Sequence, residues 1–250
     1  MKPPDWRSPE AYKGVAHLPV RDIAWEFLRR NPSYRRAFKK AQIAEEDSNK
    51  SFIDHWGINF PVDPKLSAKE AGVCWRPERC ASIIILSKIE AGTLNPSLNL
   101  SEMRGQIISQ RVEDGTHVFV QGKDYSFQLF LVASAVLESS LQANIPIDDI
   151  ADTRCEAVKR FYRFLIGEYP SCMPRRSVLR EKYPHALQAL DGCLAGASYR
   201  EIAEVMFGAA RIEQDSWKTS TIRSSTIRLA RMGVELMRSG YKDLLQTNSY

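Results

Sequence analysis

A run of serine, threonine and arginine side chains near the C-terminus has the composition of a surface that binds a polyanion. Between residues 216 and 242 the chain has six Lys or Arg residues against one acidic residue, a net charge of +5. Hydroxyl and guanidinium groups donate to phosphates, and arginine also donates to guanine edges. The segment therefore favours nucleic-acid binding. A solvated basic face with no partner is the alternative.

The same segment has the periodicity of an amphipathic helix. Its apolar and small residues fall on one side when drawn at 100° per residue; they are Ile222, Thr226, Leu229, Gly233, Leu236 and Met237. The opposite side carries Ser224, Arg228, Arg231, Glu235 and Arg238. We expect a helix over about 219–238, packed on one face and polar on the other, with a free N-terminus suited to phosphate.

The helix expected before it, SYREIAEVMFG at 198–208, has the signature of a capping box. Ser198 and Glu201 stand three residues apart, and Ile202 and Met206 share one face. The small Ala203 would let a neighbouring helix come close. Such a helix can be the first of a helix-turn-helix that braces a recognition helix.

The connection to the next helix is longer than in an ordinary helix-turn-helix. Ten residues separate Gly208 from Thr219, whereas the usual turn has three or four. Either Asp215 caps an earlier helix start at 216–217, or the motif carries an inserted loop. We expect Trp217 to fill the gap between the helices.

A second basic zone lies at the N-terminus. Residues 1–42 hold ten Lys or Arg residues against four acidic ones, a net charge of +6. Helices are expected from Pro19 to Asn31 and from Ser33 onwards, since a proline disfavours helix in the residue before it. We expect Trp25 and Phe27 to lie in a core, and the side chains of Arg29, Arg30, Arg35 and Arg36 to lie in solvent. In the alternative, Trp25, Phe27 and Tyr34 form a docking surface.

The middle of the chain predicts β-structure. Residues 82–88 read as a buried strand, and residues 106–132 read as a meander with turns at 113–116 and 121–124. The stretch 52–66 is expected to be a loop. Helices are expected from a cap at Asp148 or Asp149 to Leu165, and from about 176 to 194.

The fold class is therefore α+β. The expected division is a helical segment at 1–80, a β-rich segment at 81–145 and an all-helical segment at 146–250.

Other classes of protein find little support in the sequence. The cysteines and histidines lack the spacing of a zinc site, so no metal and no cofactor are expected, and the thiols should pack as small apolar groups. The sequence contains no phosphate loop, no nucleophile with a neighbouring base and no paired acids beside a lysine. An enzyme is therefore not expected. The longest apolar stretch, 129–137, is far shorter than the roughly 20 residues of a membrane span. The N-terminus has no signal-peptide core, so a cytoplasmic protein is expected.

Several motifs together resemble a known family of regulators. They are ALDG (189–192), LAGASYREIAEVMFG (194–208), Trp217 and STIRSSTIRLARMGVELMRSGYKDLL (220–245), with WEFLRRNPSYR (25–35), HWGINFPVDP (55–64) and WRPE (75–78). The C-terminal set looks like a proteobacterial transcription-factor-like domain, and the N-terminal set like a transcriptional-regulator-like domain that often precedes it. The combination is similar to activators of excision and transfer of integrative and conjugative elements. It implies transcriptional activation through a variant helix-turn-helix.

The resulting prediction is a sequence-specific regulator of double-stranded DNA. Its DNA-binding side chains are expected to be Tyr199, Arg200, Thr219, Ser220, Thr221, Arg223, Ser224, Arg228, Arg231, Arg238 and Lys242. Arg223 and Arg228 would reach base edges. Arg231, Arg238 and Lys242 would hold phosphates. Tyr199 and Arg200 would hold the flanking backbone. The alternative is a protein-interaction regulator, an antiactivator or a module that contacts RNA polymerase, which does not read bases.

Overall fold

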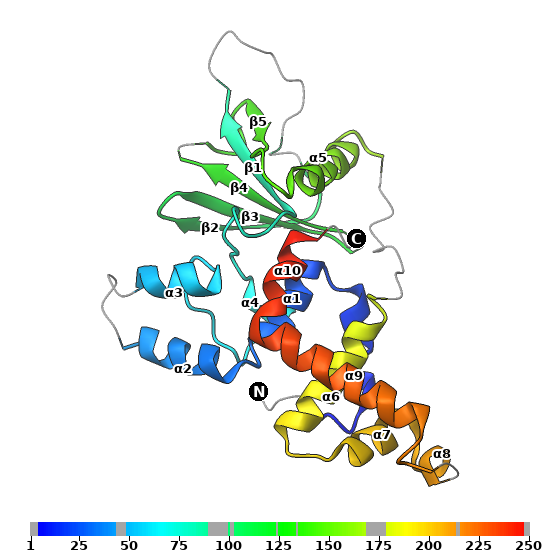
Figure 1. Cartoon of the computed structure of the whole chain (residues 1–250). Helices are drawn as coiled ribbons and strands as arrows, with labels where there is room; N and C mark the ends of the chain where they lie inside the picture. The colour runs from blue at the N-terminus through cyan, green and yellow to red at the C-terminus, as the bar shows by residue number, and fades with distance from the viewer. Residues whose placement is uncertain are drawn as a thin grey trace.

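The protein is described by a computed structural model that places a helical body beside a small mixed sheet (Figure 1). The described residues are 5–43, 49–89, 100, 103–123, 125–133, 135–168, 179–213 and 216–247. The expected α+β class is confirmed. None of the helices within these ranges is long and apolar enough to span a membrane.

The helical and strand elements follow in chain order. The helices are η1 (a 3₁₀ helix, Pro9–His17), α1 (Val20–Leu28), α2 (Pro32–Ala41), α3 (Asn49–Trp56), α4 (Ala68–Ala71), α5 (Ala151–Leu165), α6 (Lys182–Leu194), α7 (Tyr199–Phe207), α8 (Ala209–Glu213), α9 (Thr221–Glu235), η4 (a π-helical turn, Leu236–Gly240) and α10 (Tyr241–Gln246). The strands are β1 (Ile83–Lys88), β2 (Gln106–Val112), β3 (Gly115–Gln121), β4 (Ser126–Val132) and β5 (Leu141–Asn144).

The sheet confirms the expected meander and adds a crossover to it. Strands β2, β3 and β4 pair antiparallel in succession, and the strand order is β2-β3-β4-β1-β5. The earlier strand β1 joins β4 in parallel, with Ile84 opposite Leu129. The β-branched run at 83–86 is thus a central strand between β4 and β5, which explains its burial.

One face of the sheet is covered by α5. The side chains of Ala157, Phe161 and Phe164 pack on Val120 and Phe127, and Phe127 meets Phe161 at a ring-centroid distance of 5.3 Å. Arg154 fastens the helix from its N-terminal half, because its guanidinium donates to the carbonyl oxygens of Pro77 and Glu78 at 3.0 and 3.3 Å. The expected helix to Leu165 is confirmed, but neither Asp148 nor Asp149 is its N-cap residue, which is Ile150.

The larger core joins the two ends of the chain. Helix α1, with Ile23, Trp25 and Phe27 fully buried, packs against α6 and α10. The Ala81 N–H donates to the Leu245 carbonyl at 2.8 Å, so α10 also ties down the chain just before β1. The N-terminal and C-terminal helices therefore share one core.

This shared core bears on the expected division of the chain. Residues on both sides of each expected boundary, such as Phe130 and Leu187, belong to the same hydrophobic cluster as α1. The first helical segment thus has no core of its own among the described residues. The boundaries at 80 and 145 remain predictions from sequence.

Three local expectations have different outcomes. The two early helices are confirmed, and Asn31 caps α2 by accepting from the Ser33 N–H at 2.8 Å. The expectation of a loop at 52–66 is wrong in its first part, because α3 continues to Trp56. The Trp56 ring packs on the Tyr34 ring, so the apolar side of this helix is buried. The helix expected from 176 is observed from Lys182, and residues 169–178 lie outside the described ranges.

Candidate nucleic-acid interface

Helix α7 begins with the capping box that its sequence predicts. The Ser198 hydroxyl accepts from the Glu201 N–H at 3.3 Å, and the Glu201 carboxylate accepts from the Ser198 N–H at 2.7 Å. These hydrogen bonds from Ser198 hold the pKa of Glu201 below its usual value. The first turn of α7 is therefore fixed in direction before any partner binds.

Helices α6, α7 and α9 pack closely because glycines stand where they cross. A Cβ at Gly233 in α9 would lie 2.5 Å from the Ala186 carbonyl oxygen of α6. A Cβ at Gly192 in α6 would lie 2.8 Å from Cγ1 of Ile202 in α7. Ile202 and Ala203 are fully buried, as the sequence predicts. The position of α9 is thus set by backbone contacts as well as by side chains.

The long connection between α7 and α9 contains a short helix of its own. Helix α8 follows Gly208 directly, and residues 216–219 form a turn closed by the Thr219 N–H on the Ser216 carbonyl at 3.0 Å. Helix α9 begins at Thr221, so an earlier start at 216–217 is excluded, and the proposed cap Asp215 lies outside the described residues. Trp217, expected in the core, is half-buried.

One predicted contact residue has a structural role instead. Ser220 is buried, and its hydroxyl accepts from the Ile222 N–H at 3.1 Å as the N-cap of α9. The hydroxyl that was expected to face a ligand therefore fixes the start of the helix.

The other predicted side chains lie on the surface. The exposed ones are Tyr199, Arg200, Thr219, Thr221, Arg223, Ser224, Arg228, Arg231, Arg238 and Lys242. Thr226, Gly233 and Met237 on the opposite side of the same helical stretch are buried. The two-sided character predicted for 219–238 is thus present, although the stretch consists of α9 and the π-helical turn η4 rather than one α-helix.

A groove of about 410 Å³ joins α7 to the exposed face of α9. Tyr199 lines one wall, Arg231 and Arg238 line the other, and Ser239 and Cys193 also border it. Burial raises the pKa of the Cys193 thiol, so the sulfur is neutral and offers no charge to a ligand. The Glu235 carboxylate also lines this groove, so the groove presents two guanidinium groups, one carboxylate and a phenol to a ligand.

Three of the exposed cations already have partners on their own helices. Arg200 pairs with Glu204 at 3.1 Å, and Arg228 donates to the Ser225 hydroxyl at 3.3 Å. Lys242 lies over the ring of Tyr241, with Nζ 6.0 Å from the ring centroid. Such contacts in solvent are weak, so they orient the side chains at little cost to a later partner.

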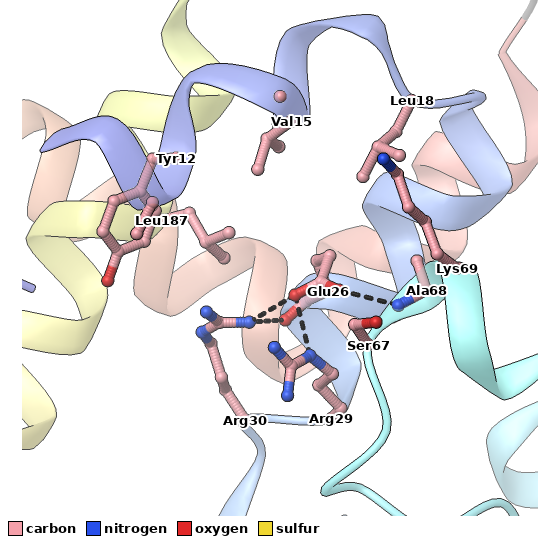
Figure 2. Close-up of a pocket in the computed structure, with 12 residues that line it drawn as sticks. Tyr12, Val15, Leu18, Glu26, Arg29, Arg30, Ser67, Ala68, Lys69 and Leu187 are labelled. Carbon is pink, nitrogen blue, oxygen red and sulfur yellow. Dashed lines mark hydrogen bonds and ion pairs between the residues drawn. The ribbon is translucent and has the colours of Figure 1, made fainter. Parts of the chain in front are cut away.

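The N-terminal basic zone differs from its expected arrangement. Arg29 and Arg30 were expected in solvent but are buried, while Arg35 and Arg36 are exposed as predicted. Figure 2 shows both buried guanidinium groups on the Glu26 carboxylate, at 2.7 Å from Arg29 and 2.8 Å from Arg30. Burial alone would raise the pKa of Glu26, but the charges of Arg30 and Arg29 lower it below its usual value.

The alternative interpretation, in which three aromatic side chains form a docking surface, is wrong. Trp25, Phe27 and Tyr34 are fully buried. Their rings pack inside the shared core, where Trp25 meets Tyr34 edge-on at a centroid distance of 5.5 Å. These aromatics have no free surface for a partner.

Sequence reasoning missed the contacts through which the N-terminal helices hold the DNA-binding segment. Arg30 donates to Asp191 of α6, and the Asn31 amide donates to the Met237 carbonyl at 3.0 Å. That carbonyl lies in the π-helical turn, where the regular hydrogen bonding of the helix changes. An acidic residue in the apolar sequence ALDG was a signal that a buried partner exists, but nothing local identifies the partner.

The cysteines and histidines form no site within the described ranges. No three His, Cys, Asp or Glu side chains there come together as metal ligands. Burial raises the pKa of Cys74 to about 12 and lowers the pKa of His117 to about 4. The neutral groups serve packing and hydrogen bonding.

Comparison with protein families gives two matches. Residues 144–246 match a family described as "T6SS, Transcription factor, DNA binding domain", which covers α5 to α10. Residues 5–61 match a family described as a proteobacterial transcriptional regulator-like domain, which covers η1 to α3. No curated protein matches the chain. The two family matches support a DNA-binding transcriptional regulator.

Proposed function

We propose that this DNA-binding transcriptional regulator reads its operator with the N-terminal half of α9, as the recognition helix of a variant helix-turn-helix. The observation that carries the proposal is the outward row of Arg223, Ser224 and Arg228 on a helix whose other side is buried. A helix fits the major groove, and arginine there donates to both acceptors of guanine.

The remaining cations have a different role in this proposal. The exposed Arg231 and Arg238, together with the exposed Lys242 on α10, hold phosphates, and the groove beside Tyr199, Arg231 and Arg238 receives one phosphate. Arg200 exchanges its weak contact with Glu204 for the flanking backbone. These contacts fix the register of α9 on the duplex but carry no sequence information.

The target genes proposed are those for excision or transfer of a mobile element, with the protein acting as an activator in the cytoplasm. The resemblance of the motifs at 25–35 and 194–245 supports this choice. The family description of residues 144–246 names T6SS, which makes promoters of such a system a second class of target. The protein itself performs no catalysis in this proposal.

A second candidate is a protein-interaction regulator that binds RNA polymerase or an antiactivator. It is supported by the exposed basic side of α2, which carries Arg35, Arg36, Lys39 and Lys40. With the nearby aromatics buried, such a surface would act through charge alone. This candidate predicts that promoter activity depends on α2 and is indifferent to α9.

Genome-wide occupancy of the tagged protein tests both candidates. The wild type is compared with Arg228→Ala and with Arg163→Ala, a control that removes an exposed arginine from α5. Base reading by α9 predicts sharp peaks that Arg228→Ala abolishes and the control retains. Peaks that survive Arg228→Ala would refute reading by that side chain. An absence of peaks, with promoter activity lost on substitution of α2, would favour the second candidate.

A further inference from the structure

A tryptophan from the start of the chain lies in the core of the candidate DNA-reading helices. Trp6 is 5% exposed and belongs to one hydrophobic cluster with Ala189 of α6, Ile202 of α7 and Ala230 of α9. The DNA-binding family match at 144–246 does not include this tryptophan. The core of these three helices is therefore completed by a residue from the other end of the chain.

Three contacts fix the position of Trp6. Its backbone carbonyl accepts from the buried Gln188 side-chain amide at 2.9 Å. Its ring lies beside Gly192 of α6, where a Cβ would stand 3.3 Å from Cε3 of the indole and 2.8 Å from Cγ1 of Ile202. The exposed Arg7 guanidinium lies over the ring, with Cζ 4.5 Å from the centroid. Helix η1, which follows in the chain, packs along α6 (Figure 1). The ring thus has a fixed place where α6 crosses α7.

The indole contributes shape to this cluster rather than a hydrogen bond. Its Nε1 atom is buried and has no acceptor within the described ranges. A buried tryptophan usually finds a partner for this N–H group, and leaving the group unpaired costs free energy. The packing of the ring is therefore what holds the side chain in place. An aromatic ring without the N–H group should serve the same purpose.

The cluster lies within one helical turn of the candidate DNA contacts. In α7, Ile202 stands three residues after the exposed Tyr199. In α9, Ala230 stands between the exposed Arg228 and Arg231. Loss of a large buried ring leaves a cavity, and the surrounding helices relax into it in part. Such a movement would change the distance between the contacts on α7 and those on α9.

We propose that Trp6 is a positioning residue for DNA binding, which holds α7 and α9 at the separation that the duplex requires. The inference rests on the proposed function, because it assumes that both helices contact one duplex. Trp6 itself does not touch the DNA. The DNA-binding unit of this chain then includes the segment around Trp6 as well as α6, α7 and α9. A chain with this segment displaced binds DNA weakly, although every side chain that contacts DNA is present.

A series of substitutions with falling side-chain volume tests the proposal in the whole protein. Fluorescence anisotropy measures the Kd for the cognate duplex, at a temperature well below the unfolding midpoint of each variant. Trp6→Phe should stay within about twofold of the wild type, whereas Trp6→Ala should raise the Kd at least about tenfold. Trp6→Leu should lie between the two, and it takes the place of Trp6→Ala if the alanine variant does not fold.

The matched control is Phe164→Ala, which removes another buried aromatic ring from the packing of α5 on the sheet. It should lower the unfolding midpoint but leave the Kd within about twofold of the wild type. Hydrogen exchange gives a second readout. In Trp6→Ala the amides of α7 and α9 should exchange faster, while those of β3 and β4 keep their wild-type protection. A general loss of stability would increase exchange in the sheet as well.

Three results would overturn the proposal: a wild-type Kd for the small variants of Trp6, a loss of binding in Trp6→Phe, or an equal loss in Phe164→Ala. Arg228→Ala in the same assay separates this outcome from a failure of the proposed function. Weak binding by Trp6→Ala with a wild-type Kd for Arg228→Ala would refute base reading by Arg228 and support positioning by Trp6. A wild type that binds no duplex would refute the proposed function, and exchange in α7 and α9 would then decide whether Trp6 positions these helices.

Discussion

Arg30 of α1 binds Asp191 of α6 through two parallel hydrogen bonds, from Nε to Oδ1 at 2.7 Å and from the NH2 nitrogen to Oδ2 at 2.8 Å. Tyr12 adds a third, from its hydroxyl to Oδ2 at 2.7 Å. All three side chains are buried. The contact joins the N-terminal helices to the helix on which α7 and α9 pack, so it positions the candidate DNA-reading surface without touching it.

Removal of this arginine should destabilise the whole protein. Arg30→Ala leaves Asp191 as an uncompensated buried charge, which typically costs about 3–5 kcal/mol of the free energy of unfolding. Urea unfolding followed by tryptophan fluorescence measures the effect. The control is Lys13→Ala, which removes an exposed pair with Glu10 and should leave the midpoint nearly unchanged.

A double variant distinguishes the contribution of the Arg30–Asp191 pair to stability from the general cost of losing a side chain. Adding Asp191→Asn to Arg30→Ala removes the stranded charge, so the double variant should be more stable than the sum of the two single effects predicts. Strict additivity would contradict a direct pairing of these two residues.

The close crossing of α6 and α9 predicts that two glycine-to-alanine substitutions will differ in their effect on the stability of the protein. Gly233→Ala places a Cβ 2.5 Å from the Ala186 carbonyl oxygen and should destabilise the protein by about 1–3 kcal/mol. Gly14→Ala meets nothing within 4 Å and should be neutral or slightly stabilising. Thermal unfolding of both variants beside the wild type is the measurement. Equal midpoints for the two variants would show that α6 and α9 do not cross so closely.

Acid should weaken the fold through His117. The ring is buried between Asn59 and Gln128, and burial lowers its pKa to about 4, although Glu78 opposes the shift. In the unfolded chain it binds a proton below its ordinary pKa of about 6.5. The free energy of unfolding should therefore fall as the pH drops from about 6.5 towards about 4, by up to about 3 kcal/mol.

The control for that prediction is His117→Gln, which retains an amide in place of the ring but cannot titrate. Urea unfolding of both proteins across the same pH window isolates the histidine from the carboxylates. A constant difference in stability between the two proteins at every pH would rule out His117 as the source.

The phosphate contacts predict a change in salt dependence. Arg231→Gln and Arg238→Gln should each reduce the slope of log K against log salt by about 1, and should weaken binding to all sequences alike. Arg228→Ala should instead relax the preference for one base and cost about 1–3 kcal/mol in binding to the cognate site. Fluorescence anisotropy with cognate and scrambled duplexes measures both. Arg163→Gln on α5 is the control, with an unchanged slope expected.

Much of the local structure could be predicted because it depends on neighbours in sequence. The capping box of Ser198 and Glu201, the breaks at Asn31 and the turn at Glu113 are patterns of a few residues, and all are observed. The outward and inward sides of α9 also followed from periodicity alone. The end of that helix did not, since a π-helical turn carries no sequence signature that a periodicity count would detect.

The burial of the arginines in α1 could not be predicted, because it depends on residues far away in the chain. In the sequence Arg30 is typical of a surface cation, because nothing shows that Asp191 lies beside it. The same holds for Arg29, whose partner is the Pro64 carbonyl. Ser220 was misassigned for a related reason. Its role as a cap depended on where α9 begins, and the long connection before it left that point open.

The packing of α1 against α10 has a consequence for synthesis of the protein. Tyr241, Leu244 and Leu245 complete the core around the first helix, although they lie far from it along the chain. Trp75 and Phe27 therefore stay uncovered until residues 241–245 have been synthesised and have packed against them. We expect a chain that stops before Tyr241 to be open to proteolysis rather than to be a truncated DNA binder.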